Sequence, residues 1–136
     1  MKKVGCIFCR IAKGDIPSKT IYEDDEFRVI LDLSPATKGH ALILPKNHYE
    51  NIYELDEESA AKIFVLAKDL SMKMKGKLKC EGLNIVQNNG EIAGQTVFHF
   101  HMHIIPRYKD DGQHIGWKQG KPTEDELEDV RKTIIG

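Results

Sequence analysis

The chain has no long hydrophobic run, and this absence excludes the classes of protein that depend on one. No uninterrupted apolar stretch is longer than the five residues of 41–45, whereas a membrane-spanning helix needs roughly 18. Two lysines near the N-terminus precede no apolar segment of the kind that a secretory signal requires. We therefore expect a protein with no membrane partner and a cytoplasmic location.

The sequence also lacks an excess of positive charge. Its 20 basic residues are balanced by 21 acidic ones, for a net charge of -1, whereas domains that bind nucleic-acid backbones are strongly basic. Repeats, Ser- or Pro-rich linkers and low-complexity tracts are absent as well. We expect no nucleic-acid partner, so any phosphate that the protein binds must be held by a local group of residues.

Length and hydrophobic pattern predict one α+β domain over residues 1–136. Runs rich in Val, Ile and Leu predict strands at residues 27–33, 41–44, 83–87 and 97–107. Helical spacing predicts a short helix at 6–13, a long helix from the cap Asp56 to Gly76, and a tail helix behind a capping box at Thr123 and Glu126. We expect a mainly antiparallel sheet with the helices on one side.

Two of the predicted helices have an apolar stripe. In the long helix the stripe consists of Ala60, Ile63, Phe64, Ala67, Leu70 and Met74. In the tail helix it consists of Leu127, Val130 and Ile134. Such stripes are typical of helices that pack against another surface.

Three of the six histidines fall within five residues, at His99, His101 and His103. In a strand the three share one face. The apolar residues that alternate with them share the other face: Phe98, Phe100, Met102 and Ile104. One explanation is an exposed surface stripe. A second is a metal held by all three side chains, although the outer two Cα atoms would lie roughly 13 Å apart along a strand.

A third explanation divides the work among the histidines. One neutral imidazole attacks an electrophile, while a neighbour on the same face donates hydrogen bonds to the charge that develops. An unperturbed pKa of about 6.5 suits histidine to this role near pH 7. Just upstream, the glycines and amide side chains of residues 88–96 have the donors that a phosphate needs, although a hairpin turn has the same composition.

Cysteine is scarce, and its spacing leaves several interpretations open. The chain has three cysteines, Cys6, Cys9 and Cys80, and a disulfide framework is not expected in the cytoplasm. Cys6 and Cys9 have the spacing of half a zinc site, which His48 and His99 could complete. They could also pack as small apolar side chains. A redox pair would be expected beside a thioredoxin-like βαβ pattern, which the sequence lacks.

Residues 94–105, GQTVFHFHMHII, resemble the signature of the histidine triad family, His-apolar-His-apolar-His-apolar-apolar. Residues 6–48 are similar to the N-terminal half of the small nucleotide-binding branch, so residues 1–107 match well and 108–136 form a variable C-terminal segment. The resemblance implies a HIT-like fold whose sheet continues across a homodimer. It also implies nucleotidyl transfer to water through a nucleotidyl-histidine intermediate.

The resemblance assigns a role to each histidine of the triad. His101 would attack the α-phosphorus while the backbone carbonyl of His99 orients its ring, and His103 would hydrogen-bond the phosphate. Gln95 and Thr96 occupy the positions that contact the leaving group in the family. Serine is frequent in the family at the position of Thr96. The implied catalytic set is His101, His103, Gln95, Thr96 and His40.

The resemblance also implies a nucleotide site in which Asp32 binds the ribose hydroxyls and apolar residues form a slot for a purine base. The expected nucleotide-binding residues are Phe8, Ile11, Ile16, Ile30, Asp32, Leu33, Asn88, Gly94, Gln95, Thr96, Val97, His101 and His103. The apolar members of this set are equally compatible with an ordinary hydrophobic core.

Zinc-bearing bacterial members of the family are similar to this chain in one further respect. They have counterparts of Cys6, Cys9, His48 and His99 as zinc ligands. Four such ligands fill the tetrahedral shell of zinc and leave no position for an activated water, so the metal would be structural. We expect one zinc ion per chain and no organic cofactor.

The sequence therefore predicts a homodimeric hydrolase or nucleotidyl transferase that acts at the α-phosphate of a purine nucleotide conjugate. A nucleoside phosphoramidate and a dinucleoside polyphosphate are both candidate substrates. The alternatives are a nucleotide-binding regulatory module with incidental hydrolysis and a metal-dependent hydrolase that uses the triad as ligands.

Overall fold

All five strands of the structure, a computed structural model that describes residues 3–136, join one antiparallel sheet in the order β1-β2-β3-β5-β4. The strands are β1 (Thr20–Glu23), β2 (Phe27–Leu31), β3 (Ala41–Pro45), β4 (Gly82–Val86) and β5 (Met102–Arg107). The helices are α1 (Ile7–Ala12), α2 (Glu57–Leu78) and α3 (Glu124–Ile135), with a 3-10 turn η1 at Glu91–Ala93. The predicted α+β class is confirmed.

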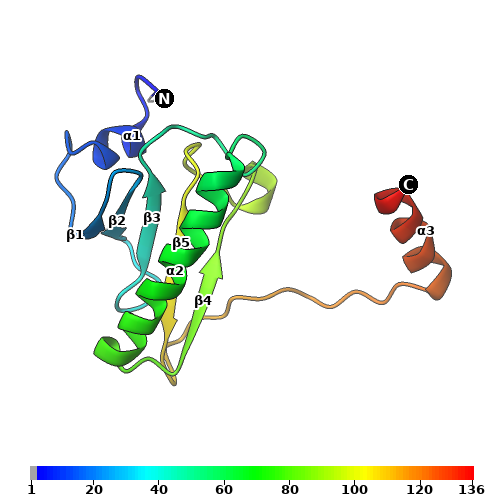
Figure 1. Cartoon of the computed structure of the whole chain (residues 1–136). Coiled ribbons are helices and arrows are strands. Elements are labelled where there is room, and N and C mark those ends of the chain that lie inside the picture. The colour runs from blue at the N-terminus through cyan, green and yellow to red at the C-terminus, as the bar shows by residue number, and fades with distance from the viewer. Residues whose placement is uncertain (1–2) are drawn as a thin grey trace.

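The sheet buries side chains on both faces because α1 and α2 lie on opposite sides of it (Figure 1). Val29 and Ile43 pack with the buried face of α2, whereas Ile30 and Leu42 pack with α1. Alternate residues of a strand point to opposite faces, so β2 and β3 supply both clusters. The expectation that all helices lie on one side is wrong for α1.

Helix α2 begins where its cap predicts and ends later than predicted. The side chain of Asp56 accepts a hydrogen bond from the backbone of Ser59, which satisfies one free N–H of the first turn. The helix passes through Gly76 and ends at Leu78, followed by Lys79 in the left-handed conformation. Phe64, expected in the buried stripe, is 59% exposed because its position lies at the edge of the packed face.

The predicted strand at 97–107 is shorter in the structure, where β5 starts at Met102. Residues 97–101 form an irregular segment, because the backbone N–H of Phe100 donates to the carbonyl of Tyr49 instead of to a neighbouring strand. Phe100 still packs in the main core, whereas Phe98 is 44% exposed. His99 and His101 therefore precede the strand, and His103 lies in it.

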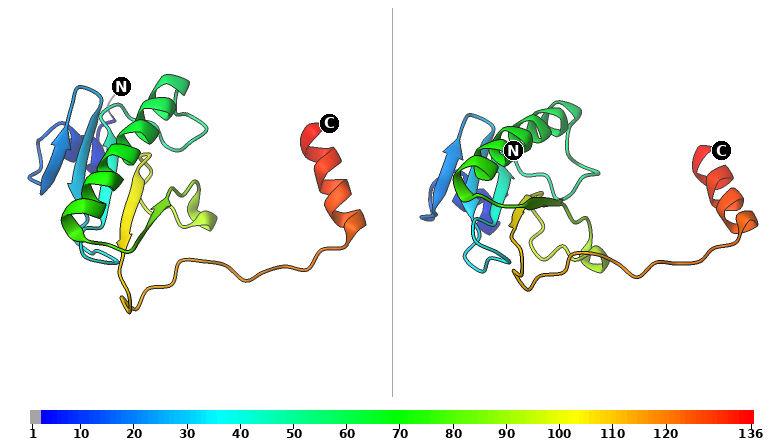
Figure 2. Two further views of the ribbon diagram at one scale, coloured as in Figure 1. Left: turned by 60° about the horizontal axis from the view of Figure 1, so that its bottom comes forward. Right: turned by 90° about the horizontal axis from the view of Figure 1, so that it is seen from below.

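The chain leaves the body of the protein after Gln113, whose side chain still bonds to Ala36. An extended arm passes the β4 side of the sheet and ends in α3, which lies apart from the body in every view (Figures 1 and 2). The predicted capping box is present, with Thr123 and Glu126 bonded reciprocally. Within residues 3–136, no helix is both long and apolar enough to cross a membrane.

Candidate functional site

A cavity of about 390 Å³ opens between α1 with the segment that follows it, strands β2 and β3, and the segment that carries the triad. Ten of the residues expected to bind a nucleotide line it: Phe8, Ile11, Ile16, Ile30, Asp32, Leu33, Thr96, Val97, His101 and His103. The apolar members come mainly from α1 and β2 and the segments that follow them, and the cavity also has two imidazoles in its lining. The cavity thus has one apolar end and one histidine-lined end.

The ring of His101 is held in one tautomer at the edge of this cavity. Its Nδ1 lies 2.7 Å from the carbonyl oxygen of His99 and donates to it, because a carbonyl can only accept. The ring of Phe8 packs edge-on against the imidazole, with centroids 5.0 Å apart. In the neutral ring Nε2 therefore has the free lone pair that a nucleophile needs.

A second chain of hydrogen bonds fixes the proton on His103. The backbone N–H of Ala36 donates to Nδ1 of His40 at 2.9 Å, so a neutral His40 has its proton on Nε2. That Nε2 lies 2.9 Å from Nδ1 of His103 and donates to it. The remaining proton of a neutral His103 is then on its own Nε2, which makes His103 a hydrogen-bond donor.

Burial keeps the imidazoles of the site neutral. It lowers the pKa of His101 against the hydrogen bond to the His99 carbonyl and the charge of Asp32, and it lowers the pKa of His40 against the charge of Asp32. The pKa of His103 falls to about 4 because burial is joined by repulsion from His101 and His40. Near pH 7 these rings are uncharged, which leaves lone pairs available for attack on an electrophile.

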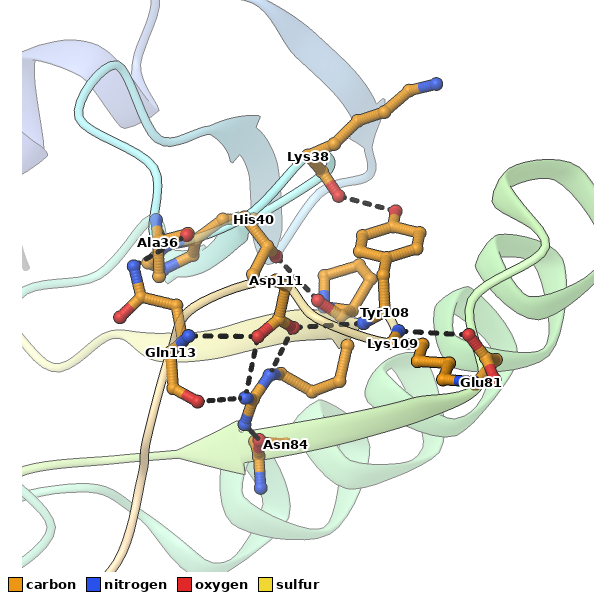
Figure 3. Close-up of polar contacts among 12 residues, drawn as sticks. Ala36, Lys38, His40, Glu81, Asn84, Tyr108, Lys109, Asp111 and Gln113 are labelled. Carbon is orange, nitrogen blue, oxygen red and sulfur yellow. Dashed lines mark hydrogen bonds and ion pairs between the residues drawn. The ribbon is translucent and has the colours of Figure 1, made fainter.

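The loop that carries His40 is tied to the chain that follows β5 (Figure 3). The hydroxyl of Tyr108 donates to the carbonyl of Lys38 at 2.7 Å, and the amide of Gln113 donates to the carbonyl of Ala36 at 2.9 Å. Asp111 pairs with the Arg107 guanidinium, and this ion pair lowers the carboxyl pKa. These contacts hold the loop in the position where His40 meets His103.

Gln95, Asn88 and Gly94 lie outside the cavity lining. Gln95 is 2% exposed, and its amide nitrogen donates to the carbonyls of Glu50 and Val97 while its oxygen accepts from the backbone of Gly90. Gln95 therefore stabilises the loop of residues 88–96 through buried hydrogen bonds. Thr96, at the end of this loop, is exposed and lines the cavity together with His101 and His103.

Six further residues of the cavity lining were not among those expected from the sequence: Ile7, Pro17, Ser18, Lys19, Leu31 and Leu42. Pro17 to Lys19 lead into β1, an exposed edge strand with no apolar run to predict it. Strand pairing sets the position of these residues, because the carbonyl of Lys19 accepts a hydrogen bond from the backbone N–H of Leu31, beside Asp32. Register of this kind is not visible in a single sequence.

His99, the first histidine of the triad, faces a different site. The metal-binding atoms of Cys6, Cys9, His48 and His99 all lie within 4.8 Å of one another. Nδ1 of His99 is 3.5 Å from the sulfur of Cys6 and 3.4 Å from that of Cys9, and Nδ1 of His48 is 3.4 Å from the Cys9 sulfur. The four residues come from α1 and its cap, the segment after β3 and the triad.

These donors fit a tetrahedral zinc ion. Zinc bonds of about 2.3 Å to sulfur and about 2.0–2.1 Å to nitrogen place neighbouring S and N ligands about 3.6 Å apart, close to the measured separations. Nε2 of His99 donates to the carbonyl of Pro45 at 2.7 Å, which leaves Nδ1 unprotonated toward the thiols. Burial lowers the pKa of His99 to about 4 and so favours the neutral ligand form.

Comparison with known proteins shows the family of the chain. A family model described as the HIT domain matches residues 13–110. The adenosine 5'-monophosphoramidase of Schizosaccharomyces pombe is 39% identical over 132 residues, which cover 96% of this chain and 96% of that relative. The chain belongs to the histidine triad, or HIT, family.

Two solved structures extend the comparison to the fold. A HIT family member from Bacillus subtilis superimposes with a TM-score of 0.90 at 43% identity and covers 96% of this chain and 95% of its own. A zinc-bound histidine triad family protein from Mycobacterium smegmatis has a TM-score of 0.76 at 33% identity, with 96% of this chain and 94% of its own covered.

Proposed function

We propose that this protein hydrolyses a purine nucleotide conjugate at its α-phosphate, with His101 as the nucleophile. The observation that carries the proposal is the bond from Nδ1 of His101 to the carbonyl of His99, which leaves Nε2 with a lone pair at the cavity. The name of the S. pombe relative, an adenosine 5'-monophosphoramidase, supports a phosphoramidate as the substrate.

The reaction takes two displacements at phosphorus. Nε2 of His101 attacks the α-phosphorus, the bond from phosphorus to the leaving group breaks, and the leaving group takes a proton from the solvent. Water then attacks the same phosphorus and gives up a proton to the solvent, the bond to Nε2 breaks, and the nucleoside monophosphate is released. The Nε2–H group of His103 donates a hydrogen bond to a phosphate oxygen in both steps, where charge develops.

The substrate is oriented by the two ends of the cavity. The apolar end, with Phe8, Ile30 and Leu33, takes the flat base, and the carboxylate of Asp32 accepts hydrogen bonds from the ribose hydroxyls. The hydroxyl of Thr96 serves the leaving group, since it is exposed beside His101 and His103. His40 acts through His103 and does not need to touch the substrate.

Zinc has a structural part in the proposal. One ion per chain would be held by Cys6, Cys9, His48 and His99, and these four ligands complete its shell. When bound, it supplies a cross-link and no activated water. Because His99 is a ligand, the carbonyl that orients His101 is held in place as well.

We infer that two chains form a homodimer through β4. This strand is an edge of the sheet, so its outer backbone groups have no partner strand in the described residues. Ile85 on β4 is 38% exposed, and Met72, which lines a surface hollow beside β4, is 66% exposed. Antiparallel pairing of two β4 strands would join the sheets and cover this surface.

The experiment that tests the function is replacement of His101 by alanine. With adenosine phosphoramidate or diadenosine polyphosphate as substrate, His101→Ala should release adenosine monophosphate at least about a thousand-fold more slowly, because loss of a nucleophile removes the covalent route. His114→Ala, which removes an exposed histidine of the arm, should stay within about threefold of the wild type. Unchanged release by His101→Ala would refute the assignment.

A further inference from the structure

Strand β2 carries an arginine among buried apolar residues. Phe27 and Val29 on either side of it are buried, and 15% of the Arg28 side chain is exposed. Alternate residues of a strand share a face, so Arg28 lies on the same face as Ile30, which packs against α1 and lines the cavity. A guanidinium in such a place needs hydrogen-bond acceptors, because burial of an unpaired charge is unfavourable.

The acceptors of Arg28 come from two elements. Its Nε donates to the carbonyl of Ala12, the last residue of α1, at 3.1 Å. One terminal nitrogen donates to the hydroxyl of Thr20, the first residue of β1, at 3.2 Å, and the other donates to the carboxylate of Glu23 at 2.8 Å. Lys46 lies 2.6 Å from the same carboxylate and helps to hold it. One planar side chain therefore joins the end of α1 to the edge strand β1, whose places in the fold Figure 1 shows.

The two elements that Arg28 joins bound the loop of residues 13–19. Ala12 precedes this loop and Thr20 follows it, so the guanidinium links the two ends of the loop. An added Cβ at Gly14 would lie 3.4 Å from the same guanidinium, which shows that the loop backbone passes close to it. The loop supplies four residues to the cavity lining: Ile16, Pro17, Ser18 and Lys19.

Backbone hydrogen bonds fix each end of the loop separately. The N–H of Ile16 donates to the carbonyl of Arg10 in α1, and the carbonyl of Lys19 accepts from the N–H of Leu31 in β2. Neither bond connects one end of the loop to the other. The bonds of Arg28 add this direct connection, so they set the separation of the two ends.

We propose that Arg28 is a positioning residue for recognition of the nucleotide base. This inference rests on the proposed function, which places the base at the apolar end of the cavity. One wall of that end is α1 with Phe8 and Ile11, and another is the loop of residues 13–19 with Ile16. Because Arg28 links the ends of this loop, it holds the two walls at the separation that a flat base requires. Such preorganisation lowers the free-energy cost of binding.

The histidine-lined end of the cavity is held by other contacts. Nδ1 of His101 donates to the carbonyl of His99, and Nδ1 of His103 accepts from His40. The hydrogen bonds of Arg28 that the structure describes involve none of these groups. Loss of Arg28 should therefore weaken binding of the base without slowing the chemical step, which raises KM and leaves kcat unchanged.

Binding of two ligands that differ in the base tests the proposal. Adenosine monophosphate has a base, a ribose and a phosphate, whereas ribose 5-phosphate lacks the base. Arg28→Leu should raise the dissociation constant of adenosine monophosphate about tenfold, the factor expected if the free loop keeps its binding position about a tenth of the time. The dissociation constant of ribose 5-phosphate should stay within about twofold of the wild type. Equal weakening of both ligands, or of neither, would overturn the proposal.

Steady-state kinetics provide a second measurement. With adenosine phosphoramidate as substrate, Arg28→Leu should raise KM about tenfold and keep kcat within about twofold of the wild type. Arg10→Leu, which removes an exposed arginine of α1, is the matched control and should leave KM and both dissociation constants within about twofold. A fall in kcat with an unchanged KM would contradict the role of Arg28 in base binding.

Thr20→Val tests the same link from its other end. It removes one acceptor of Arg28 at an exposed position and should raise the dissociation constant of adenosine monophosphate about threefold. Added to Arg28→Leu, it should cause no further loss, because the hydroxyl then has no guanidinium to accept from. Fully additive losses would contradict the link. If Arg28→Leu does not fold, Thr20→Val alone decides the question with the same two ligands.

The outcomes separate this inference from the proposed function. If the wild type releases no adenosine monophosphate from the phosphoramidate, yet Arg28→Leu weakens adenosine monophosphate and not ribose 5-phosphate, the proposed function fails and the role of Arg28 stands. If the wild type is active and Arg28→Leu keeps its KM, the role of Arg28 fails alone.

Discussion

At the residue scale, the three histidines of the triad differ in what each ring nitrogen meets. Nδ1 of His101 donates to a backbone carbonyl, whereas Nδ1 of His103 accepts from the ring of His40. Nδ1 of His99 faces two thiols because its Nε2 is bonded to the carbonyl of Pro45. One sequence motif thus supplies an oriented lone pair, an oriented proton donor and a nitrogen that faces two thiols.

The resemblance implied these roles and the bond that orients His101 on the carbonyl of His99, but not the bonds that orient His103. The resemblance to the family assigned His99 to zinc and His101 to attack. The bond from the backbone of Ala36 to His40, which sets the proton on His103, depends on how residues 34–40 turn. No residue type in that turn predicts it, since any backbone N–H could serve.

The lowered pKa of His103 predicts a pH dependence of stability. Its pKa is about 4 in the folded protein and about 6.5 in an unfolded chain. Between these values the unfolded state binds more protons, so the contribution of His103 to the free energy of unfolding falls as the pH is lowered from about 6.5 to about 4. His103→Asn should therefore have a shallower fall than the wild type in urea unfolding measured across this range.

The control for this measurement is His114→Asn. It removes an exposed histidine of the arm and should keep the wild-type slope. If wild type and His103→Asn lose stability in parallel between these pH values, the burial of His103 is not the source of the dependence.

At the element scale, periodicity predicted the long helix and four of the five strands, and it failed where tertiary contacts decide. The edge strand β1 was missed because all four of its residues are exposed and it has no apolar run. The triad strand was predicted too long, since β5 begins only at Met102. Gly76 does not end α2, because one exposed glycine costs a helix less than the packing of Leu78 contributes.

The turn before β3 offers a prediction about Gly39. This glycine has a φ of +91°, and an added Cβ would lie 2.5 Å from a methyl carbon of Leu78. Gly39→Ala should lower the free energy of unfolding by about 1–2 kcal/mol through backbone strain. It should also slow turnover, because His40 follows directly. Chemical denaturation and steady-state kinetics measure the two effects.

Gly76→Ala is the matched control. It lies inside α2 with no heavy atom within 4 Å of the added Cβ, so it should raise the free energy of unfolding by about 0.5–1 kcal/mol and leave turnover unchanged. If Gly39→Ala behaves like Gly76→Ala, the turn is not constrained in the way that its φ indicates.

At the scale of the whole molecule, the cysteine and histidine cluster joins parts of the chain that are far apart in sequence. It brings α1, the segment after β3 and the triad to one point, within reach of the cavity that α1 also lines. A zinc ion there would anchor the short N-terminal helix, which packs against β3 through few residues. The spacing of Cys6 and Cys9 predicted half of this site.

Removal of one thiol tests the role of zinc. Purified protein should contain about one zinc per chain, and Cys6→Ser should lose most of it and unfold at a lower temperature. Cys80→Ser, which changes a buried thiol outside the cluster, should retain the metal. Elemental analysis and calorimetry measure both properties, and equal zinc content in Cys6→Ser and the wild type would exclude this ligand set.

The central claim is that His101 becomes covalently bonded to the nucleotide, and the mass of the protein during turnover tests it most directly. Wild-type protein mixed with adenosine phosphoramidate and quenched within one turnover, under alkaline denaturing conditions that preserve a phosphorus–nitrogen bond, should carry one adenylyl group on the peptide that contains His101. The same peptide of His101→Ala should stay unmodified. Release of adenosine monophosphate at full rate with no adduct, or an adduct on another residue, would contradict the account.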